Sequence, residues 1–350
     1  MDERAFNAAQ GFLLAAKMYW TTTLYRALRD EFIAHHSSGD SDDSSVEQVA
    51  DILEDSTLYQ YFAWLERHLQ RMKYAGRYGL MPYHQERPEL LGDKSSTAEL
   101  DPALDLPGYY TGVDIHQHPG GLWSDETAGL VYERGARSTT PMLGEAHKDL
   151  HDRFADLVAT TGEPKRILDM GGGFGKSTGP LSERFPAANV DSIDLSAPCV
   201  TLGAQLAKQR HLDNIRYRQM DARSTDYGDE AFDLVTSTMV LHELPTKALE
   251  ELFDEAFRLL EPGGRTVHLD FYAIPDGFRR FIHYGHARRN NEPFMQPLAS
   301  MDLEALLKKK GFVDIEITPF KESEDIDIEK NDAWRFPWTV IAASKPAGPD

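Results

Sequence analysis

The stretch from Asp169 to Gly175 has the residue types and the spacing of a ligand-binding turn. Asp169 ends a short apolar run, and Gly171, Gly173 and Gly175 follow at alternate positions. Glycine adopts positive φ without strain and lets a ligand approach the backbone closely. A helical pattern follows the turn, and the N-terminus of a helix offers unpaired N–H groups to polar or anionic atoms. We therefore expect a strand, a turn and a helix that hold a ligand at the carboxyl end of the strand.

Two common nucleotide-binding motifs do not fit this turn. A phosphate-binding loop needs a glycine five positions before Gly175, where Met170 stands. A dinucleotide fingerprint needs a glycine three positions after Gly173, and that residue is Lys176. The remaining pattern, Asp-x-Gly-x-Gly-x-Gly, resembles motif I of the class I S-adenosylmethionine-dependent methyltransferases.

Further features of that family follow in the same order along the chain. Asp194 ends the next apolar run and resembles the acid that accepts both ribose hydroxyls, a contact that suits a carboxylate. Asp221 resembles the acid that receives the adenine amino group. Phe232-Asp-Leu-Val resembles the fourth-strand motif, and Leu260-Glu-Pro-Gly-Gly264 is similar to the turn before the fifth strand.

The resemblance implies S-adenosylmethionine as the cofactor. The cofactor-binding residues that it implies are Asp169, Gly171, Gly173, Gly175, Asp194, Leu195, Asp221, Ala222 and Thr238. Two of the acids also have a purely structural interpretation: Asp194 could cap the next helix, and Asp221 could be a turn residue.

Methyl transfer from a sulfonium is an in-line displacement, so the protein must hold the nucleophile close to the methyl group and in line with the breaking bond. A hydroxyl nucleophile also needs a base, most often His, whereas a thioether or a tertiary amine needs none. His242 follows the fourth predicted strand, where O-methyltransferases of the capped kind place a general base, and it is our first catalytic candidate. It could instead be a His that packs at the end of the strand.

A second group of candidates lies between residues 109 and 137. Aromatic, histidine and arginine side chains gather there beside glycines, which suits the wall of a pocket. We predict that Tyr110, His116 and Arg137 face the acceptor and that His116 takes part in catalysis. The alternative is a turn that packs against the next domain with its polar groups satisfied locally. No metal is predicted, because the segment has no second cluster of ligands to complete a site.

The region after the fifth predicted strand supplies the last candidate. In this family it commonly forms part of the substrate pocket, and here it carries Arg279, Arg280, His283 and His286. Arginine suits bidentate contact with a carboxylate, so we predict that His283 and its neighbours hold the acceptor. An amphipathic helix with its basic face in water is the alternative.

Residues 1–143 contain the candidates between 109 and 137 and must position them. Apolar side chains recur at helical spacing over 4–35, 46–53 and 58–72, and a connection without periodicity follows over 84–108. The region resembles the dimerising, substrate-capping domains that precede the catalytic domain in some small-molecule methyltransferases. We therefore predict a mainly helical domain that caps the site and could form a homodimer through its helices.

Residues 144–350 alternate strands with helices, which predicts a mostly parallel, doubly wound sheet. The fold class is α/β, with a seven-stranded, Rossmann-like methyltransferase sheet. Its last two strands could pair antiparallel, because no long helix separates them. The predicted strands lie around Ile167–Leu168 and over 189–195, 215–220, 232–240, 265–271, 312–318 and 338–343.

Composition limits the partners. The formal charge of −20 argues against nucleic acid as a partner. Cys199 is the only cysteine, so an intrachain disulfide is impossible. No apolar run reaches the length of a membrane span, and the N-terminus lacks a signal-like segment, so we expect a cytoplasmic protein with no membrane partner.

The leading functional hypothesis is methyl transfer to a small-molecule acceptor through oxygen, nitrogen or sulfur. Three alternatives stay open: S-methylation of a methylthio carboxylic acid in osmolyte biosynthesis, of the dimethylsulfoniopropionate type; intramolecular cyclisation of S-adenosylmethionine; and a non-catalytic cofactor-binding subunit.

Overall fold

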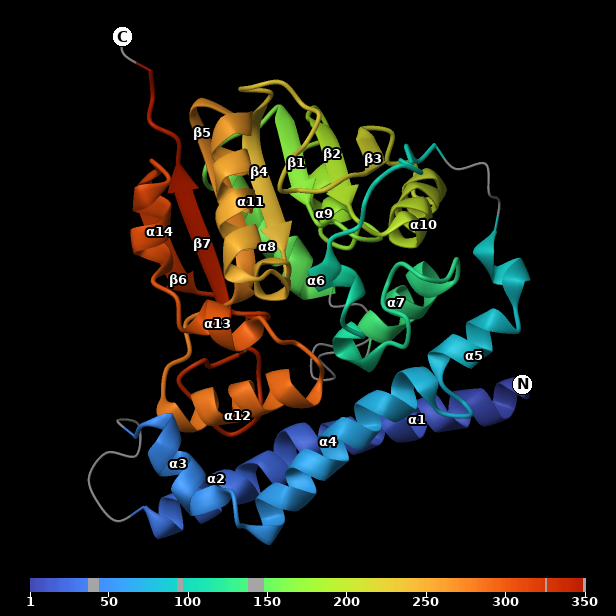
Figure 1. The fold of residues 1–350 in the computed structure, drawn as a ribbon, viewed down its shortest axis with the longest axis vertical. Helices are drawn as coiled ribbons and strands as arrows, with labels where there is room; N and C mark the ends of the chain where they lie inside the picture. The colour runs from blue at the N-terminus through green and yellow to red at the C-terminus, as the bar shows by residue number, and fades with distance from the viewer. Residues whose placement is uncertain (37–43, 93–96, 138–147, 325, 349–350) are drawn as a thin grey trace.

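A seven-stranded sheet lies at the centre of the computed structural model (Figure 1). The structure describes residues 1–36, 44–92, 97–137, 148–324 and 326–348. The strands are β1 (Arg166–Met170), β2 (Asn189–Asp194), β3 (Ile215–Gln219), β4 (Phe232–Thr238), β5 (Leu260–Phe271), β6 (Val313–Pro319) and β7 (Trp338–Ser344). Their order is β3-β2-β1-β4-β5-β7-β6. Strands β1 to β5 are parallel, and β7 is antiparallel to both β5 and β6. The predicted α/β fold and its antiparallel end are confirmed.

Helices cover both faces of the sheet because successive residues of a strand point to opposite sides. Ile167 and Leu234 pack in one core with helices α8 and α9, whereas Leu168 and Val235 pack in a second core with α11 and α14. In Figure 1, α11 lies in front of the sheet and α8 behind it. These helices are α8 (Lys148–Ala159), α9 (Thr178–Arg184), α10 (Ala197–Gln209), α11 (Thr246–Leu259), α12 (Gly277–Arg289), α13 (Met295–Ala299) and α14 (Leu303–Lys309).

The fifth strand begins earlier than the sequence predicts. The Glu-Pro-Gly-Gly segment was expected to be a turn, but Leu260 already pairs with Phe232 at the start of β5. The pairing register shifts between Phe232 and Leu234, and Gly263 has a φ of 82°. Glycine makes this irregular start possible without strain.

The N-terminal region is helical, as predicted. Its elements are α1 (Glu3–Tyr19), a π-helical turn (Trp20–Leu24), α2 (Tyr25–His35), α3 (Val46–Leu53), α4 (Thr57–Ala75) and α5 (Leu80–Gln85). Asp2, Ser45 and Ser56 cap the N-termini of α1, α3 and α4 with side-chain hydrogen bonds. In Figure 1, α1 and α4 run side by side along one end of the molecule, with α12 between them and the sheet. None of the described helices combines the length and the apolar character needed to cross a membrane.

A long connection joins this helical end to the sheet. It contains two 3₁₀ turns (Pro88–Leu91 and Ile115–Gln117) and the helices α6 (Gly108–Thr111) and α7 (Ala128–Ala136). The backbone of Glu99 forms a parallel bridge to β3, donating from its N–H to Tyr217 O (2.9 Å) and accepting from Gln219 N–H (2.8 Å). Helix α7 packs on α10, where a Cβ on Gly129 would lie 2.5 Å from Pro198 O. The predicted domain boundary at residue 143 lies outside the described residues.

Candidate functional site

The glycine turn follows β1 and has positive φ at Gly171 (68°), Gly173 (54°) and Gly175 (88°). A Cβ on Gly171 would lie 2.5 Å from Val240 Cγ2, and a Cβ on Gly175 would collide with the Tyr217 ring. The backbone conformation and the lack of space therefore both require glycine at these two positions.

Asp169 stabilises the turn by hydrogen bonds to the residues that follow it. Its side chain is fully buried and accepts hydrogen bonds from Ser177 Oγ (2.8 Å) and Thr178 Oγ1 (2.6 Å). Burial raises the pKa of Asp169 to about 6, although the two hydroxyls act to lower it. Asp169 thus fixes the turn to the start of α9.

Asp194 ends β2 and faces the same turn. Its Oδ2 accepts from Gly173 N–H (3.0 Å), and its Oδ1 accepts from Ser196 N–H (2.7 Å). Burial raises its pKa to about 6, whereas the two backbone N–H groups lower it. Each carboxylate oxygen can accept a further hydrogen bond, so the structural role of Asp194 leaves room for two hydroxyl groups.

A cavity of about 100 Å³ opens between the turn and the following strand ends. It is lined by Gly171, Gly173, Asp194, Leu195, Asp221, Ala222 and Thr238, together with Tyr109, Tyr110, Leu122, Tyr132, Met220 and Glu243. Seven of the nine predicted cofactor-binding residues therefore meet in one place. Asp169 lies behind this wall, and Gly175 lines a separate groove. Asp221 is paired with Arg223 through its Oδ2 (2.6 Å to Nη2).

A second cavity, of about 120 Å³, lies between the sheet and the N-terminal helices. The two cavities share walls at Tyr132, Gly171, Gly173, Thr238, Met239 and Glu243. The N-terminal region contributes Lys17, Trp20, Thr21, Glu66, Leu69, Gln70 and Tyr74. We call this second cavity the acceptor cavity, after the acceptor that the sequence predicts beside the glycine turn. Because the walls are shared, ligands in the two cavities would lie next to each other.

His242 lines the acceptor cavity just after β4. Its Nδ1 donates to Asp270 Oδ1 (2.6 Å), and Asp270 Oδ2 accepts from Val240 N–H (2.9 Å) and Leu241 N–H (2.7 Å). Burial acts to lower the pKa of His242, but Asp270 raises it overall. Nε2 is the ring nitrogen left to act on a substrate. Sequence reasoning missed Asp270, although an acid near the end of β5 was a signal for it.

His116 lies between two carboxylates. Its Nδ1 donates to Glu292 Oε1 (3.0 Å), and its Nε2 lies 3.3 Å from Glu243 Oε1. Burial would lower the pKa of His116, but the two glutamates raise it to about 10, and the pKa of Glu292 falls to about 2 despite burial. His116 is therefore an imidazolium with both nitrogens engaged, which leaves none to accept a substrate proton. The backbone at His116 is left-handed, with a φ of 55°.

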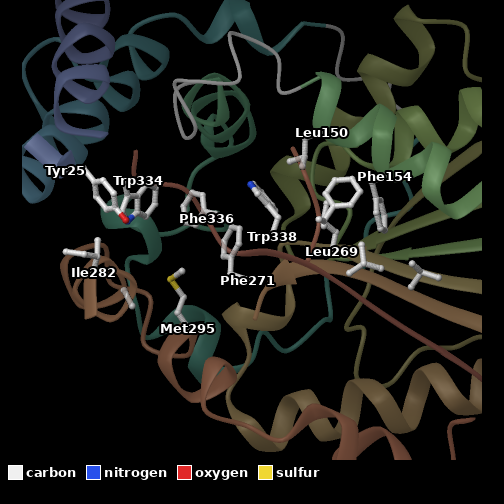
Figure 2. Close-up of a cluster of buried hydrophobic side chains, with 14 of the residues drawn as sticks. Tyr25, Leu150, Phe154, Leu269, Phe271, Ile282, Met295, Trp334, Phe336 and Trp338 are labelled. Atoms are coloured by element: carbon white, nitrogen blue, oxygen red, sulfur yellow. The ribbon is translucent and has the colours of Figure 1, made fainter. Parts of the chain in front are cut away.

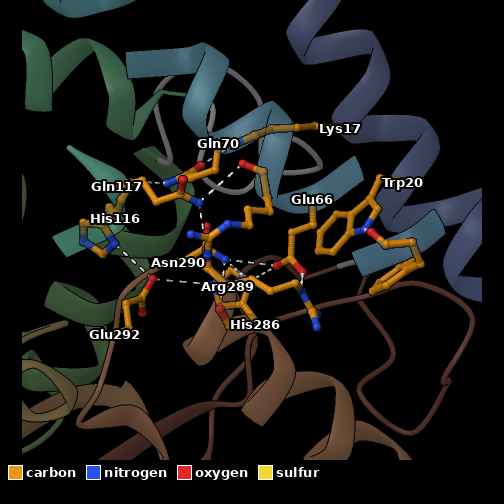
Figure 3. Close-up of polar contacts among 12 residues, drawn as sticks. Lys17, Trp20, Glu66, Gln70, His116, Gln117, His286, Arg289, Asn290 and Glu292 are labelled. Carbon is orange, nitrogen blue, oxygen red and sulfur yellow. Dashed lines mark hydrogen bonds and ion pairs between the residues drawn. The ribbon is translucent and has the colours of Figure 1, made fainter. Parts of the chain in front are cut away.

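We call His116, Glu243 and Glu292 the His116 triad. A buried ionic network joins this triad to the N-terminal helix α4 (Figure 3). Glu66 of α4 accepts from His286 Nδ1 and Arg289 Nε of α12 and from Asn290 Nδ2 (3.1 Å). His286 Nε2 also lies 3.7 Å from Glu292 Oε1. In addition, Gln70 donates to the backbone carbonyl of His116 (3.0 Å). Sequence reasoning identified none of these pairings, because they join residues far apart in the chain.

Aromatic side chains form the remaining wall of the acceptor cavity. Trp20, Phe271, Trp334, Phe336 and Trp338 all line it. The ring centroids of Phe271 and Phe336 are 4.1 Å apart, those of Phe271 and Trp338 4.8 Å, and those of Trp334 and Phe336 4.6 Å. Figure 2 shows these four rings side by side between α12 and the sheet. We call these five residues the aromatic wall.

The other predicted contacts are placed differently. Tyr110 lines the first cavity rather than the acceptor cavity. Arg137 is exposed, pairs with Glu133 (2.7 Å) and lines a surface groove. His283 is buried beyond the aromatic wall, in a separate cavity of about 310 Å³, where burial lowers its pKa to about 3. The structure does not bring Arg137 and His283 to the acceptor cavity.

The described residues contain no group of three or more His, Cys, Asp or Glu side chains arranged to hold a metal ion.

A family model described as a methyltransferase domain matches residues 167–264, from β1 to the start of β5. The chain carries a class I methyltransferase domain. The chain is 36% identical over 125 residues to a demethylmenaquinone methyltransferase of Thermus thermophilus, a match that covers 36% of the chain and 55% of the relative.

The match to an arsenite methyltransferase of Halobacterium salinarum extends further. It is 25% identical over 257 residues and covers 68% of the chain and 62% of the relative. The chain thus spans between about half and two thirds of the length of these curated relatives.

Solved structures also resemble the chain. A phosphoethanolamine N-methyltransferase of Haemonchus contortus, solved with S-adenosyl-L-methionine, is 16% identical, with a TM-score of 0.46 and coverage of 69% of this chain and 60% of that one. A methyltransferase of Aquifex aeolicus is 13% identical, with a TM-score of 0.43 and coverage of 63% and 98%.

Proposed function

We propose that the protein transfers a methyl group from S-adenosylmethionine to a small molecule enclosed in the acceptor cavity. The observation that carries the proposal is the pair of cavities that share walls at the glycine turn. One offers the acids expected for a nucleoside, and the other is bordered by the N-terminal helices. This arrangement suits two ligands held with their reactive atoms adjacent.

The residues of the first cavity fit the cofactor. Asp194 has acceptor capacity for two ribose hydroxyls, and Asp221, which also lines this cavity, is our candidate to accept from an adenine amino group. Thr238 Oγ1 is buried without a hydrogen-bond partner among the described residues, so a ligand atom could satisfy it. Bound cofactor would supply an electrophilic methyl group, and the chain would bind and orient it.

We expect a small acceptor because the N-terminal helices form part of the cavity wall, through Trp20, Glu66 and Gln70 among others. A confined acceptor is held in alignment with the methyl group, and the rate of displacement depends steeply on that alignment. Methylation of a methylthio acid, cyclisation of the cofactor and a non-catalytic role stay predictions, as does a cytoplasmic location.

Cofactor binding and product identity test the proposal. S-adenosylmethionine and S-adenosylhomocysteine should both raise the thermal midpoint, because a ligand that binds only the native state stabilises it. A screen of small acids, phenols, amines and thioethers should then release S-adenosylhomocysteine with at least one acceptor. Methylthioadenosine as the product would indicate cyclisation. No product from any compound, with intact cofactor binding, would favour the non-catalytic subunit.

We also propose that two copies associate through the outer faces of α1 and α4. Several large apolar side chains are exposed there, including Phe12 (60% exposed), Tyr61 (45%) and Trp64 (54%). Exposed apolar side chains of this size favour contact with another protein surface. Sedimentation should give the mass of a dimer, and the double variant Phe12→Asp/Trp64→Asp should be a monomer that still binds S-adenosylhomocysteine. A monomeric parent protein would contradict this proposal.

A further inference from the structure

The cavity that contains His283 has no part in the proposed function. It has a volume of about 310 Å³ and borders on the acceptor cavity, because Trp334, Phe336 and Trp338 line both of them (Figure 2). His283 lines only the larger of the two, which we call the His283 cavity. Its volume is at the lower end of the range for small-molecule sites and is far more than one bound water requires.

His283 is a buried polar side chain that lacks a partner. It is 2% exposed, and neither of its ring nitrogens has a hydrogen-bond partner among the described residues. Burial, together with the nearby His286, lowers the pKa of His283 to about 3, so the ring is neutral near pH 7. A neutral imidazole has one N–H donor and one acceptor nitrogen, and native proteins rarely leave such groups both buried and unsatisfied. A ligand in the cavity that donates and accepts a hydrogen bond would satisfy the ring.

The rest of the cavity wall suits an apolar ring. Most of the lining residues are apolar, and Phe320, Pro275 and Pro337 lie there with the rings that also border the acceptor cavity. Aromatic and apolar ring surfaces bury a large area at little conformational cost and pack well on one another. A mostly apolar wall with one polar group is the usual composition of a small-molecule site.

The charged side chains of this wall are already compensated or lie in solvent. The three cations are paired with carboxylates: Arg279 with Asp276 (2.9 Å), Arg335 with Glu322 (2.7 Å) and Lys330 with Asp327 (3.8 Å). Glu329, which also lines the cavity, is exposed. A charged ligand would therefore lose hydration without gaining a buried counter-charge from the described residues, and that loss is unfavourable.

We propose that the His283 cavity binds a second small molecule, an uncharged ring compound with a hydroxyl or a similar group that donates and accepts a hydrogen bond at His283. The apolar body of this ligand packs against Trp334, Phe336 and Trp338. The site is separate from the one that methyl transfer requires, so it does not depend on the identity of the acceptor.

Ligands that share one ring and differ in one substituent test the ligand class. The full-length protein is titrated with benzyl alcohol, benzoate and benzylammonium, and binding is followed by nuclear magnetic resonance. We expect benzyl alcohol to bind at least about tenfold more tightly than either ion, because the ions must be desolvated without a counter-charge. Equal or tighter binding of either ion overturns the proposal. Failure to bind S-adenosylhomocysteine would contradict the proposed function and would leave this result unaffected.

Removal of the polar group tests the role of His283. The variant His283→Phe keeps a ring and removes both nitrogens, so benzyl alcohol should bind about fivefold more weakly or worse, the cost of an ordinary hydrogen bond. Toluene, which forms none, should bind equally to both proteins. The matched control is His84→Phe, because His84 is also buried with both ring nitrogens unpartnered among the described residues but lines neither cavity. Equal loss in the two variants would contradict a contact with His283.

A matched pair of alanines separates the two cavities. Ala333 lines the His283 cavity and Ala136 lines the acceptor cavity. Ala333→Leu reduces the space for the ligand and should weaken the binding of benzyl alcohol, whereas Ala136→Leu should leave it unchanged. The reverse result would place benzyl alcohol in the acceptor cavity and overturn the proposal, as would an unchanged affinity in both His283→Phe and Ala333→Leu. Circular dichroism confirms that each variant is folded.

Discussion

The two cavities of this protein are built by different means. The first is shaped by backbone: positive-φ glycines, backbone N–H groups bonded to Asp194, and acids at the ends of adjacent parallel strands. The acceptor cavity is shaped by side chains from segments far apart in the chain, held by the Glu66 and His116 ionic contacts and by the aromatic wall. A backbone-built site tolerates few changes of ligand. A side-chain-built site can change its ligand by substitution while the fold stays the same.

The largest effect on stability should come from breaking the ionic network between α4 and α12. Glu66→Ala leaves Arg289 and His286 without their shared carboxylate, and an uncompensated buried charge costs about 3–5 kcal/mol of unfolding free energy. Urea unfolding measures the change. The matched control is Glu304→Ala, which removes the exposed i,i+4 pair with Lys308 and should change the unfolding free energy far less. Equal losses in the two variants would show that the network does not stabilise the fold.

Asp194→Ala tests the backbone-built cavity. The free energy of S-adenosylhomocysteine binding should weaken by about 1.5–3 kcal/mol, the range for hydrogen bonds to a charged group. Calorimetry measures it, with Asp254→Ala, an exposed acid on α11, as the control. Unchanged affinity would remove Asp194 from the cofactor site.

The pH dependence of stability tests the His116 triad. The pKa of His116 in the folded protein is raised to about 10, so its stabilising effect is complete below the unfolded value near 6.5 and is lost as the pH rises toward 10. We expect the unfolding free energy to fall between pH 7 and 10 as His116 loses its proton in the folded protein. In His116→Asn this part of the alkaline decrease should be absent. The same slope in both proteins would show that His116 is neutral in the fold.

The smallest effect is expected at Arg137, which lines a surface groove and not the acceptor cavity. Arg137→Ala removes an exposed i,i+4 ion pair with Glu133, worth about 0.3–0.5 kcal/mol. Turnover and cofactor affinity should be unchanged. A tenfold loss of turnover would restore Arg137 as an acceptor contact, as the sequence predicted.

The part of this organisation that could be predicted is the part encoded locally. Asp194, Asp221 and the alternate glycines stand at strand ends within one continuous alternation of strands and helices, so a motif and a secondary-structure pattern locate them. The pairing of His116 with Glu292 spans 176 residues, and nothing in the local sequence indicates it. His283 was predicted to contact the acceptor, but it faces another cavity, because the rotation of α12 is set by its packing on α3 and α4, which the local sequence does not show.

The bridge between Glu99 and β3 has a consequence for colloidal stability. β3 is an outer strand of the sheet, and outer strands present unpaired backbone groups that can recruit strands from other molecules. Here the chain's own connection occupies part of that edge, and Arg218 beside it is paired with both Glu99 (2.8 Å) and Asp226 (2.7 Å). Charged side chains and a covered backbone both oppose intermolecular strand addition. Cleavage of the connection near Glu99 should therefore promote aggregation before it affects either cavity, and light scattering after limited proteolysis would detect it.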